Sequence, residues 1–121
     1  MKTISQLCCA LAAAVVLSVT AEPAAAYSAQ DLYEPCHEGD ADSRWGAAAE
    51  AECEQYILGF TDAYLLLTDG GKADNICLPE QNRLDEVRWA FMRWYHQHFD
   101  DRAQPAGEGL HKVLKAGFAC K

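Results

Sequence analysis

Disulfide bonds set the limits within which this chain can fold. The chain has six cysteines, and Cys8 and Cys9 lie in or at the start of an apolar N-terminal run that is expected to be removed. The four that remain are Cys36, Cys53, Cys77 and Cys120. An even number of cysteines in an exported chain is typical of disulfide bonding, because the compartment is oxidising. We therefore predict two disulfides in the mature chain.

The N-terminus has the three-part pattern of a secretory signal peptide. Lys2 supplies a positive start, residues 7–19 form an uncharged and mostly apolar run, and Ala24-Ala25-Ala26 offers small residues before a cut at Tyr27. Cleavage after Ala21 or Ala25 remains open. A membrane anchor is the alternative, but the run is shorter than the roughly 20 residues that span a bilayer. We predict a signal peptide over residues 1–26, one domain over 27–121, no membrane association after cleavage and a periplasmic location.

Length and charge exclude several classes of protein. With 121 residues, of which 50% are hydrophobic, the chain is long enough for one domain and is not a disordered polymer. Its net charge of −8 argues against binding nucleic acid or anionic membranes. Acidic residues concentrate at Asp40 and Asp42 and at Glu50, Glu52 and Glu54. Such a run is usually a solvated face, and it could also contact a basic protein surface.

Hydrophobic residues recur at steps of three and four, which predicts an all-α fold. Ser28 with an acid three residues later weakly resembles a capping box, which would begin a helix. Residues 37–43 are polar and predict a loop, and residues 69–71 predict a turn. Pro79 suits the first position of a further helix. The predicted helices cover about residues 29–35, 46–68 and 79–98 and a last segment that begins at Pro105. Four helices with short links make a small disulfide-stapled bundle.

Two of the predicted helices have clear apolar faces. In the second helix the face comprises Ala49, Cys53, Ile57, Phe60, Tyr64 and Leu67. In the third it comprises Leu84, Val87, Phe91, Trp94, Tyr95 and His98. Trp89 and Met92 lie off this face, toward another neighbour, an oligomer partner or solvent. Gly59 and Ala63 are four apart, so we predict that another helix packs closely against Gly59.

The helix order predicts which cysteines pair. Consecutive helices joined by short links run antiparallel, so Cys36 at the end of the first helix should lie near Cys53 in the second. By the same reasoning, Cys77 before the third helix should lie near Cys120 after the last. We therefore predict the disulfides Cys36–Cys53 and Cys77–Cys120.

No set of residues indicates catalysis, a metal or a cofactor. Disulfides use every mature cysteine, and no Gly-x-Ser-x-Gly or Gly-rich phosphate loop is present. His96 and His98 diverge on a helix, His37 sits in the predicted loop and His111 stands alone, so no zinc site is predicted. Asp62 could be a buried acid, but an exposed position or pairing with Arg88 or Arg93 is the simpler reading.

The cysteines and two short motifs occur in an order found in a known family. The residues are Cys36, Cys53-x-x-Tyr56-Ile57-x-Gly59-Phe60-x-Asp62-Ala63, Cys77-Leu78-Pro79, the Val87/Phe91/Trp94/His98 face and Phe118-Ala119-Cys120. Over nearly all of residues 31–121 this order resembles the Rap/Tai family of periplasmic immunity proteins. Ala119 and Phe99 stand where members often have proline. Most of the matching residues are framework, so they speak for the fold more than for any one toxin.

The resemblance implies a function. Members of the family are small disulfide-bonded helical proteins, often dimeric, that protect bacteria from cell-wall amidase toxins delivered by type VI secretion. It therefore implies an amidase-type toxin as protein partner, a homodimer, and neither catalysis nor a cofactor. No inhibitory residue can be transferred, because the recognition surface varies with the toxin.

Rigid helices joined by loops suggest where a partner would bind. The candidate loops are 70–75 and 100–107, and the candidate partner-binding residues are Gly70, Gly71, Lys72, Asp100, Asp101 and Arg102. The alternative function is that of an acid-stress chaperone of the HdeA type. Those proteins have one disulfide, whereas this chain has cysteines for two. An enzyme is the third reading.

Overall fold

A computed structural model describes residues 25–41 and 44–121, and these residues form four α-helices and two 3₁₀ turns. The elements are α1 (Ala29–Asp40), α2 (Gly46–Leu67), η1 (Lys72–Asp74), α3 (Arg83–Gln97), η2 (Phe99–Asp101) and α4 (Ala106–Gly117). The described part contains no strand, only isolated β-bridges that join Ser28 to Pro105 and Ile76 to Ala119. The predicted all-α fold is confirmed. The predicted signal peptide, apart from its last two residues, lies outside the described residues, as do Asp42 and Ser43.

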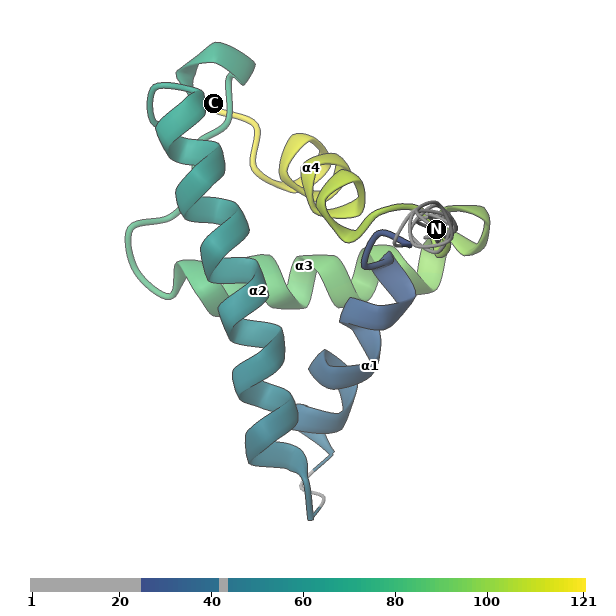
Figure 1. Cartoon of the computed structure of the whole chain (residues 1–121). Helices are drawn as coiled ribbons and strands as arrows, with labels where there is room; N and C mark the ends of the chain where they lie inside the picture. Colours follow the sequence, from purple (N-terminus) through teal and green to yellow (C-terminus); the bar gives the residue numbers. More distant parts are fainter. Residues whose placement is uncertain (1–24, 42–43) are drawn as a thin grey trace, which may run out of the picture.

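The helices are arranged as two pairs. α1 and α2 share the most extensive contact, and in Figure 1 they converge toward the short connection between them. α3 runs across both, and α4 packs on α3 (Figure 1). Tyr27 at the start of the domain and Cys120 at its end are both tied to their surroundings, by a side-chain hydrogen bond and by a disulfide respectively.

One apolar core lies where the four helices meet. Its fully buried members include Leu32, Ile57, Val87, Phe91, Leu110 and Leu114. The predicted face of α3 is confirmed for Val87, Phe91, Trp94 and Tyr95, which are all buried. Each helix therefore contributes buried residues to a shared interior.

The predicted face of α2 is partly wrong. Cys53, Ile57 and Tyr64 are buried as expected, but Leu67 is 83% exposed. Thr61 takes a buried place instead, and its hydroxyl is satisfied by donating to the Ile57 carbonyl at 2.8 Å. The buried stripe thus follows steps of four, four and three residues.

Both predicted cysteine pairings are observed. Cys36–Cys53 joins the C-terminal part of α1 to α2, and Cys77–Cys120 joins the segment before α3 to the residue that follows α4 by a few positions. The antiparallel packing of short-linked helices explains both bonds.

α1 is longer than predicted, because Pro35 does not end it. The helix continues to Asp40 with Pro35 inside. A proline lacks the N–H that would bond to the carbonyl four residues earlier, which here belongs to Asp31. The Tyr27 hydroxyl lies 2.9 Å from that Asp31 carbonyl and shares its single hydrogen between this oxygen and Glu52 Oε1 at 2.7 Å, so it partly replaces the missing donor. The capping box at Ser28 and Asp31 is formed as the sequence suggested.

α3 begins later than predicted. It starts at Arg83, so Pro79 is not its first residue. Asn82 precedes the helix in a left-handed conformation, with φ of 51°, which interrupts any helical path from Pro79. The Arg83 Nε donates to the Pro79 carbonyl at 3.2 Å and closes the bend between them.

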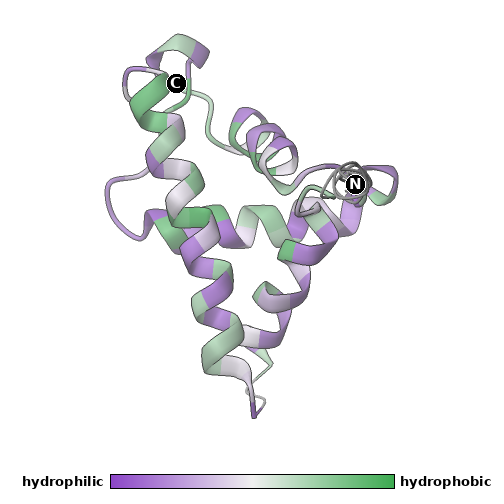
Figure 2. Ribbon diagram, viewed as in Figure 1, coloured by the Kyte–Doolittle hydropathy of each residue, from purple (hydrophilic) through white to green (hydrophobic). Residues whose placement is uncertain are grey.

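Gly59 does not pack against another helix, so that prediction is wrong. A Cβ built on Gly59 would meet no atom within 4 Å. This part of α2 faces outward because the buried stripe follows Ile57 and Thr61. Figure 2 shows that the C-terminal end of α2 is strongly hydrophobic, and Leu66 and Leu67 there are exposed.

Candidate functional site

The two predicted partner-binding loops lie at opposite ends of α4. Residues 100–105 lead directly into the helix. Residues 72–75 are held beside its far end, where Cys77 N donates to the Phe118 carbonyl at 2.8 Å and Cys120 N donates to the Asn75 carbonyl at 2.9 Å. A helix of 12 residues is about 18 Å long. The six predicted residues therefore form two separate patches.

The first patch surrounds η1 and has a defined backbone. Asp69, Gly70, Gly71 and Asn75 all have positive φ, between 51° and 91°. A Cβ at Gly71 would lie 2.3 Å from the Ile76 carbonyl oxygen, so only glycine fits there. The backbone that carries the exposed Lys72 therefore has a defined conformation.

A side-chain cluster connects η1 to the helices on either side of it. The Tyr64 hydroxyl donates to Asp74 Oδ2 at 2.6 Å, and His111 Nε2 of α4 lies 3.4 Å from the same oxygen. Burial, followed by the hydrogen bond to Asp74, raises the pKa of Tyr64 to about 12. The Tyr64 hydrogen bond in turn lowers the pKa of Asp74, with a further contribution from His111. Asp74 therefore joins η1 to α2 through the Tyr64 hydrogen bond, and His111 brings α4 beside the same carboxylate.

The second patch, around η2, is held by a guanidinium between two rings. Arg102 Cζ lies 4.3 Å from the centre of the Tyr95 ring and 4.0 Å from that of Phe99. Asp101 pairs with Lys112 of α4 at 3.0 Å and also accepts from Gln104. These contacts engage Asp101 and Arg102 internally, whereas Asp100 is exposed.

The Arg102 stack continues into a column of rings that the sequence did not suggest. Tyr33 of α1 stacks on Tyr95 at 4.0 Å between ring centres, and His37 stacks on Tyr33 at 5.5 Å. The Tyr33 hydroxyl also lies 3.1 Å from His96 Nε2. The four-residue spacing of Tyr33 and His37 on one helix was a signal that could have indicated this column. The column fixes η2 against α1 and α3.

Arg88 is a buried cation that sequence reasoning considered only as a possible partner of Asp62. It is 3% exposed, and its guanidinium contacts Asp40 at 2.5 Å, Glu50 at 3.5 Å and the Cys36 carbonyl at 3.1 Å. Part of the acidic run is therefore the counter-charge of an arginine in the interior, and not only a solvated face. The available signal was that Arg88 lies three and seven residues before Phe91 and Tyr95, on the buried side of the helix.

The remaining predicted residues make no chemical site. Among the described residues, no three His, Cys, Asp or Glu side chains are grouped as metal ligands, and no described helix is long and apolar enough to cross a membrane. Asp62 is exposed on α2, and Arg88 pairs with other acids. What the surface does offer is exposed large apolar side chains, which suit protein contacts: Trp45, Leu58, Leu66, Leu67, Trp89 and Phe99.

Comparison with known proteins places this architecture in a family. The family description that matches is "Rap1a immunity proteins", and the match covers residues 28–120. It therefore spans α1 to α4 and both disulfides. No curated protein and no solved structure matches the chain.

Proposed function

The chain belongs to the family of Rap1a immunity proteins, and we propose that it binds and blocks a cell-wall amidase toxin delivered by a type VI secretion system. The observation that carries this proposal is the extent of the family match, which includes every helix and both disulfides of the described domain. An immunity protein acts by occupying its toxin, so the proposed activity is stoichiometric binding without catalysis.

Export is part of the same proposal. The signal-like pattern of residues 1–26 would deliver the chain to the periplasm, where a wall-cutting amidase acts. The two disulfides suit that oxidising compartment. Family members are often dimeric, and we extend the proposal to a homodimer of this chain.

The surface fits an inhibitor that covers a cleft. Each predicted loop is braced by side chains from neighbouring elements, η1 through Asp74 and η2 through Arg102. A loop held in one conformation loses little entropy when it binds. Phe99, which is 69% exposed beside Asp100, supplies the kind of aromatic anchor that often dominates an interface.

The test is protection of cells from the toxin. A candidate cell-wall amidase toxin is exported to the periplasm of a sensitive strain, with and without co-expression of the full chain. We expect the full chain to prevent lysis, and a version without residues 1–26 to fail because it stays in the cytoplasm. Equal lysis with and without the full chain would contradict the proposal. If the protein instead protects unrelated proteins from aggregating, and only in strong acid, the HdeA-type alternative is correct.

Binding by the loops is tested separately. Lys72→Glu and Asp100→Lys reverse exposed charges in the two patches, and Asp62→Lys makes a matched reversal on α2. We expect one or both loop variants to weaken amidase binding with an unchanged melting temperature, while Asp62→Lys binds as wild type does. If neither loop variant weakens binding, the loops are not the contact.

A further inference from the structure

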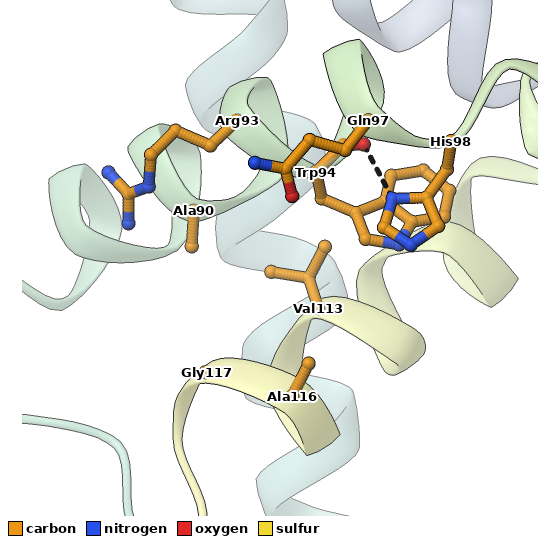
Figure 3. Close-up of a pocket in the computed structure, with 8 residues that line it drawn as sticks. All are labelled: Ala90, Arg93, Trp94, Gln97, His98, Val113, Ala116 and Gly117. Carbon is orange, nitrogen blue, oxygen red and sulfur yellow. Dashed lines mark hydrogen bonds between the residues drawn. The ribbon is translucent and has the colours of Figure 1, made fainter.

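A groove between α3 and α4 lies outside both predicted loops. Its lining residues are Ala90, Arg93, Trp94, Gln97, His98, Val113, Ala116 and Gly117. In Figure 3, the side chains of Val113 and Ala116 rise from α4 toward α3, and the Gln97 amide extends over the space between the helices. The groove has a volume of about 200 Å³. Small-molecule pockets usually have about 300–1,000 Å³, so this groove suits a single protruding side chain.

The floor of the groove is apolar and its rim is polar. Trp94 and Val113 are 6% and 2% exposed and form a firm floor. His98 covers one end of it, because its ring stacks on Trp94 at 4.9 Å and its Nδ1 lies 2.8 Å from the Trp94 carbonyl oxygen. A carbonyl only accepts hydrogen bonds, so Nδ1 carries the proton and Nε2 points elsewhere.

Two hydrogen-bond donors on the rim are unused. Arg93 and Gln97 are exposed, and within the described residues neither side chain has a hydrogen bond or an ion pair. This distinguishes Arg93 from Arg88 and Arg102, whose guanidinium groups are engaged within the protein. A carboxylate brought to this rim would find a cation and an amide N–H with no competing internal partner.

The local charge is opposite to that of the whole chain. The protein has 18 Asp and Glu residues and a net charge of −8, yet no carboxylate lines the groove and Arg93 does. Asp40 and Glu50, which reach α3 from α1 and α2, pair with Arg88 and not with Arg93. The exposed acid nearest along α3, Glu86, lies two turns before Arg93 and does not line the groove. Electrostatic complementarity therefore favours an acidic partner segment here, whereas a basic one is favoured over the acidic parts of the surface.

The groove is continuous with one predicted patch. His98 is both the C-cap of α3 and the N-cap of η2, so the groove ends where the η2 loop begins. A partner that contacts Phe99 and Asp100 can therefore contact the groove as well, because the two surfaces are adjacent. On the premise of the proposed function, we propose that this groove is a subsite of the toxin interface. It receives an apolar side chain of a toxin loop, while an adjacent carboxylate of that loop pairs with Arg93.

Two glycines provide a matched test of the apolar part. A Cβ on Gly117, which lines the groove, or on Gly59, on the outer face of α2, would meet no atom within 4 Å. Neither residue has a positive φ, so leucine fits both backbones. We expect Gly117→Leu to fill the groove and weaken amidase binding about tenfold or more, and Gly59→Leu to leave it within about twofold. Unchanged binding by Gly117→Leu, or equal losses for both variants, would overturn the proposal.

The charged part has its own pair of variants. Arg93→Glu reverses the rim cation, and Lys121→Glu makes the same change at an exposed site that does not line the groove. We expect Arg93→Glu to weaken binding several-fold more than Lys121→Glu does, at equal melting temperature. If both variants bind the amidase equally well, the carboxylate assignment is wrong.

A peptide probe tests the groove without the toxin, so that its failure and the failure of the proposed function can be told apart. Acetyl-Ser-Leu-Asp-Ser-amide is titrated at millimolar concentration into the ¹⁵N-labelled protein, with acetyl-Ser-Leu-Lys-Ser-amide as control. We expect the acidic peptide to shift the backbone resonances of Trp94, Val113 and Ala116, and Gly117→Leu to abolish these shifts. Absent shifts, or equal shifts with the lysine peptide, would overturn the proposal whether or not the chain binds an amidase.

Discussion

The two disulfides hold two regions of different character. At the junction of α1 and α2, Cys36 and Cys53 are buried, and beside them the buried Arg88 pairs with two half-exposed acids, Asp40 and Glu50. At the other end of α2, the Cys77–Cys120 disulfide is partly exposed and holds irregular backbone next to η1. The first region is regular helix packed on helix. The second is a turn whose shape depends on residues with positive φ.

This difference indicates that the first region stabilises the helix packing and the second presents side chains on the surface. At the junction the Arg88 guanidinium is buried and pairs with Asp40 of α1 and Glu50 of α2, so these charged groups hold three helices together. The η1 region keeps its side chains exposed and uses the disulfide, Asp74 and two backbone hydrogen bonds to keep its shape. In this small domain with a thin core, one disulfide therefore stabilises packed helices and the other holds an exposed turn in shape.

Removal of each disulfide should have the largest effects. Cys77→Ala/Cys120→Ala opens a separation of 43 residues, and Cys36→Ala/Cys53→Ala opens one of 17. Loop-closure entropy predicts losses of about 4 and about 3 kcal/mol in the free energy of unfolding. Urea denaturation of both double variants measures which disulfide contributes more to the free energy of unfolding. A much larger loss at the shorter loop would show that burial of Cys36 and Cys53 outweighs chain entropy.

Alanine at one glycine in each region compares their packing. At Gly39 a Cβ would lie 2.9 Å from Glu50 Cα, and the expected overpacking costs about 1–3 kcal/mol. At Gly71 the clash with the Ile76 carbonyl is closer and the φ of 91° adds backbone strain, so Gly71→Ala should cost more than Gly39→Ala. Thermal melts of the two variants test this order. If Gly71→Ala costs less, the η1 backbone is not held as described.

Between the two regions, Gly59 should respond in the opposite direction. Its Cβ position is open, so Gly59→Ala gains helix propensity without a clash and should raise stability by up to about 1 kcal/mol. The same melts measure the change. Destabilisation by Gly59→Ala would mean that this face of α2 is covered by another molecule or element in solution.

The smallest effect is a pH dependence of the η1 region. The pKa of Asp74 is lowered, chiefly by the Tyr64 hydrogen bond, below the value of about 3.9 expected when unfolded. Ionised Asp74 therefore contributes stability above pH 4, and this contribution is lost as the pH falls through the lower folded pKa. We expect Asp74→Asn to melt below wild type at pH 7, with the difference disappearing in stronger acid. Asp62→Asn, at an exposed site, is the charge control and should show no such convergence.

Several parts of the fold followed from the sequence because they depend on local spacing. The face of α3 with Val87 and Phe91 was readable from its three- and four-residue steps, and the disulfide pairs followed from helix order. Errors arose where a distant group changed a local preference. Pro35 stays inside α1, where the Tyr27 hydroxyl lies beside the carbonyl that the proline leaves without its helical donor. Gly59 is open because the buried stripe of α2 passes through Thr61.

The candidate site was less predictable than the fold. The loop over 70–75 is where the turn residues placed it, and the loop predicted over 100–107 ends at residue 105, because α4 begins at Ala106. The helix that separates the loops makes two patches out of the six predicted residues. The ring column under Arg102 and the groove beside Arg93 each combine residues from different helices. No local pattern in one segment encodes such a combination.

By itself the sequence determined the helices, their order, the cysteine framework and a family resemblance, since these depend on residue spacing along the chain. Only the tertiary structure decided which of the arginines is buried, which is held between rings and which is left free on a groove. A guanidinium takes its role from the charges, carbonyls and rings that packing brings to it, and those come from other helices. The same side chain is a structural ion pair at Arg88 and an unused donor at Arg93 for that reason.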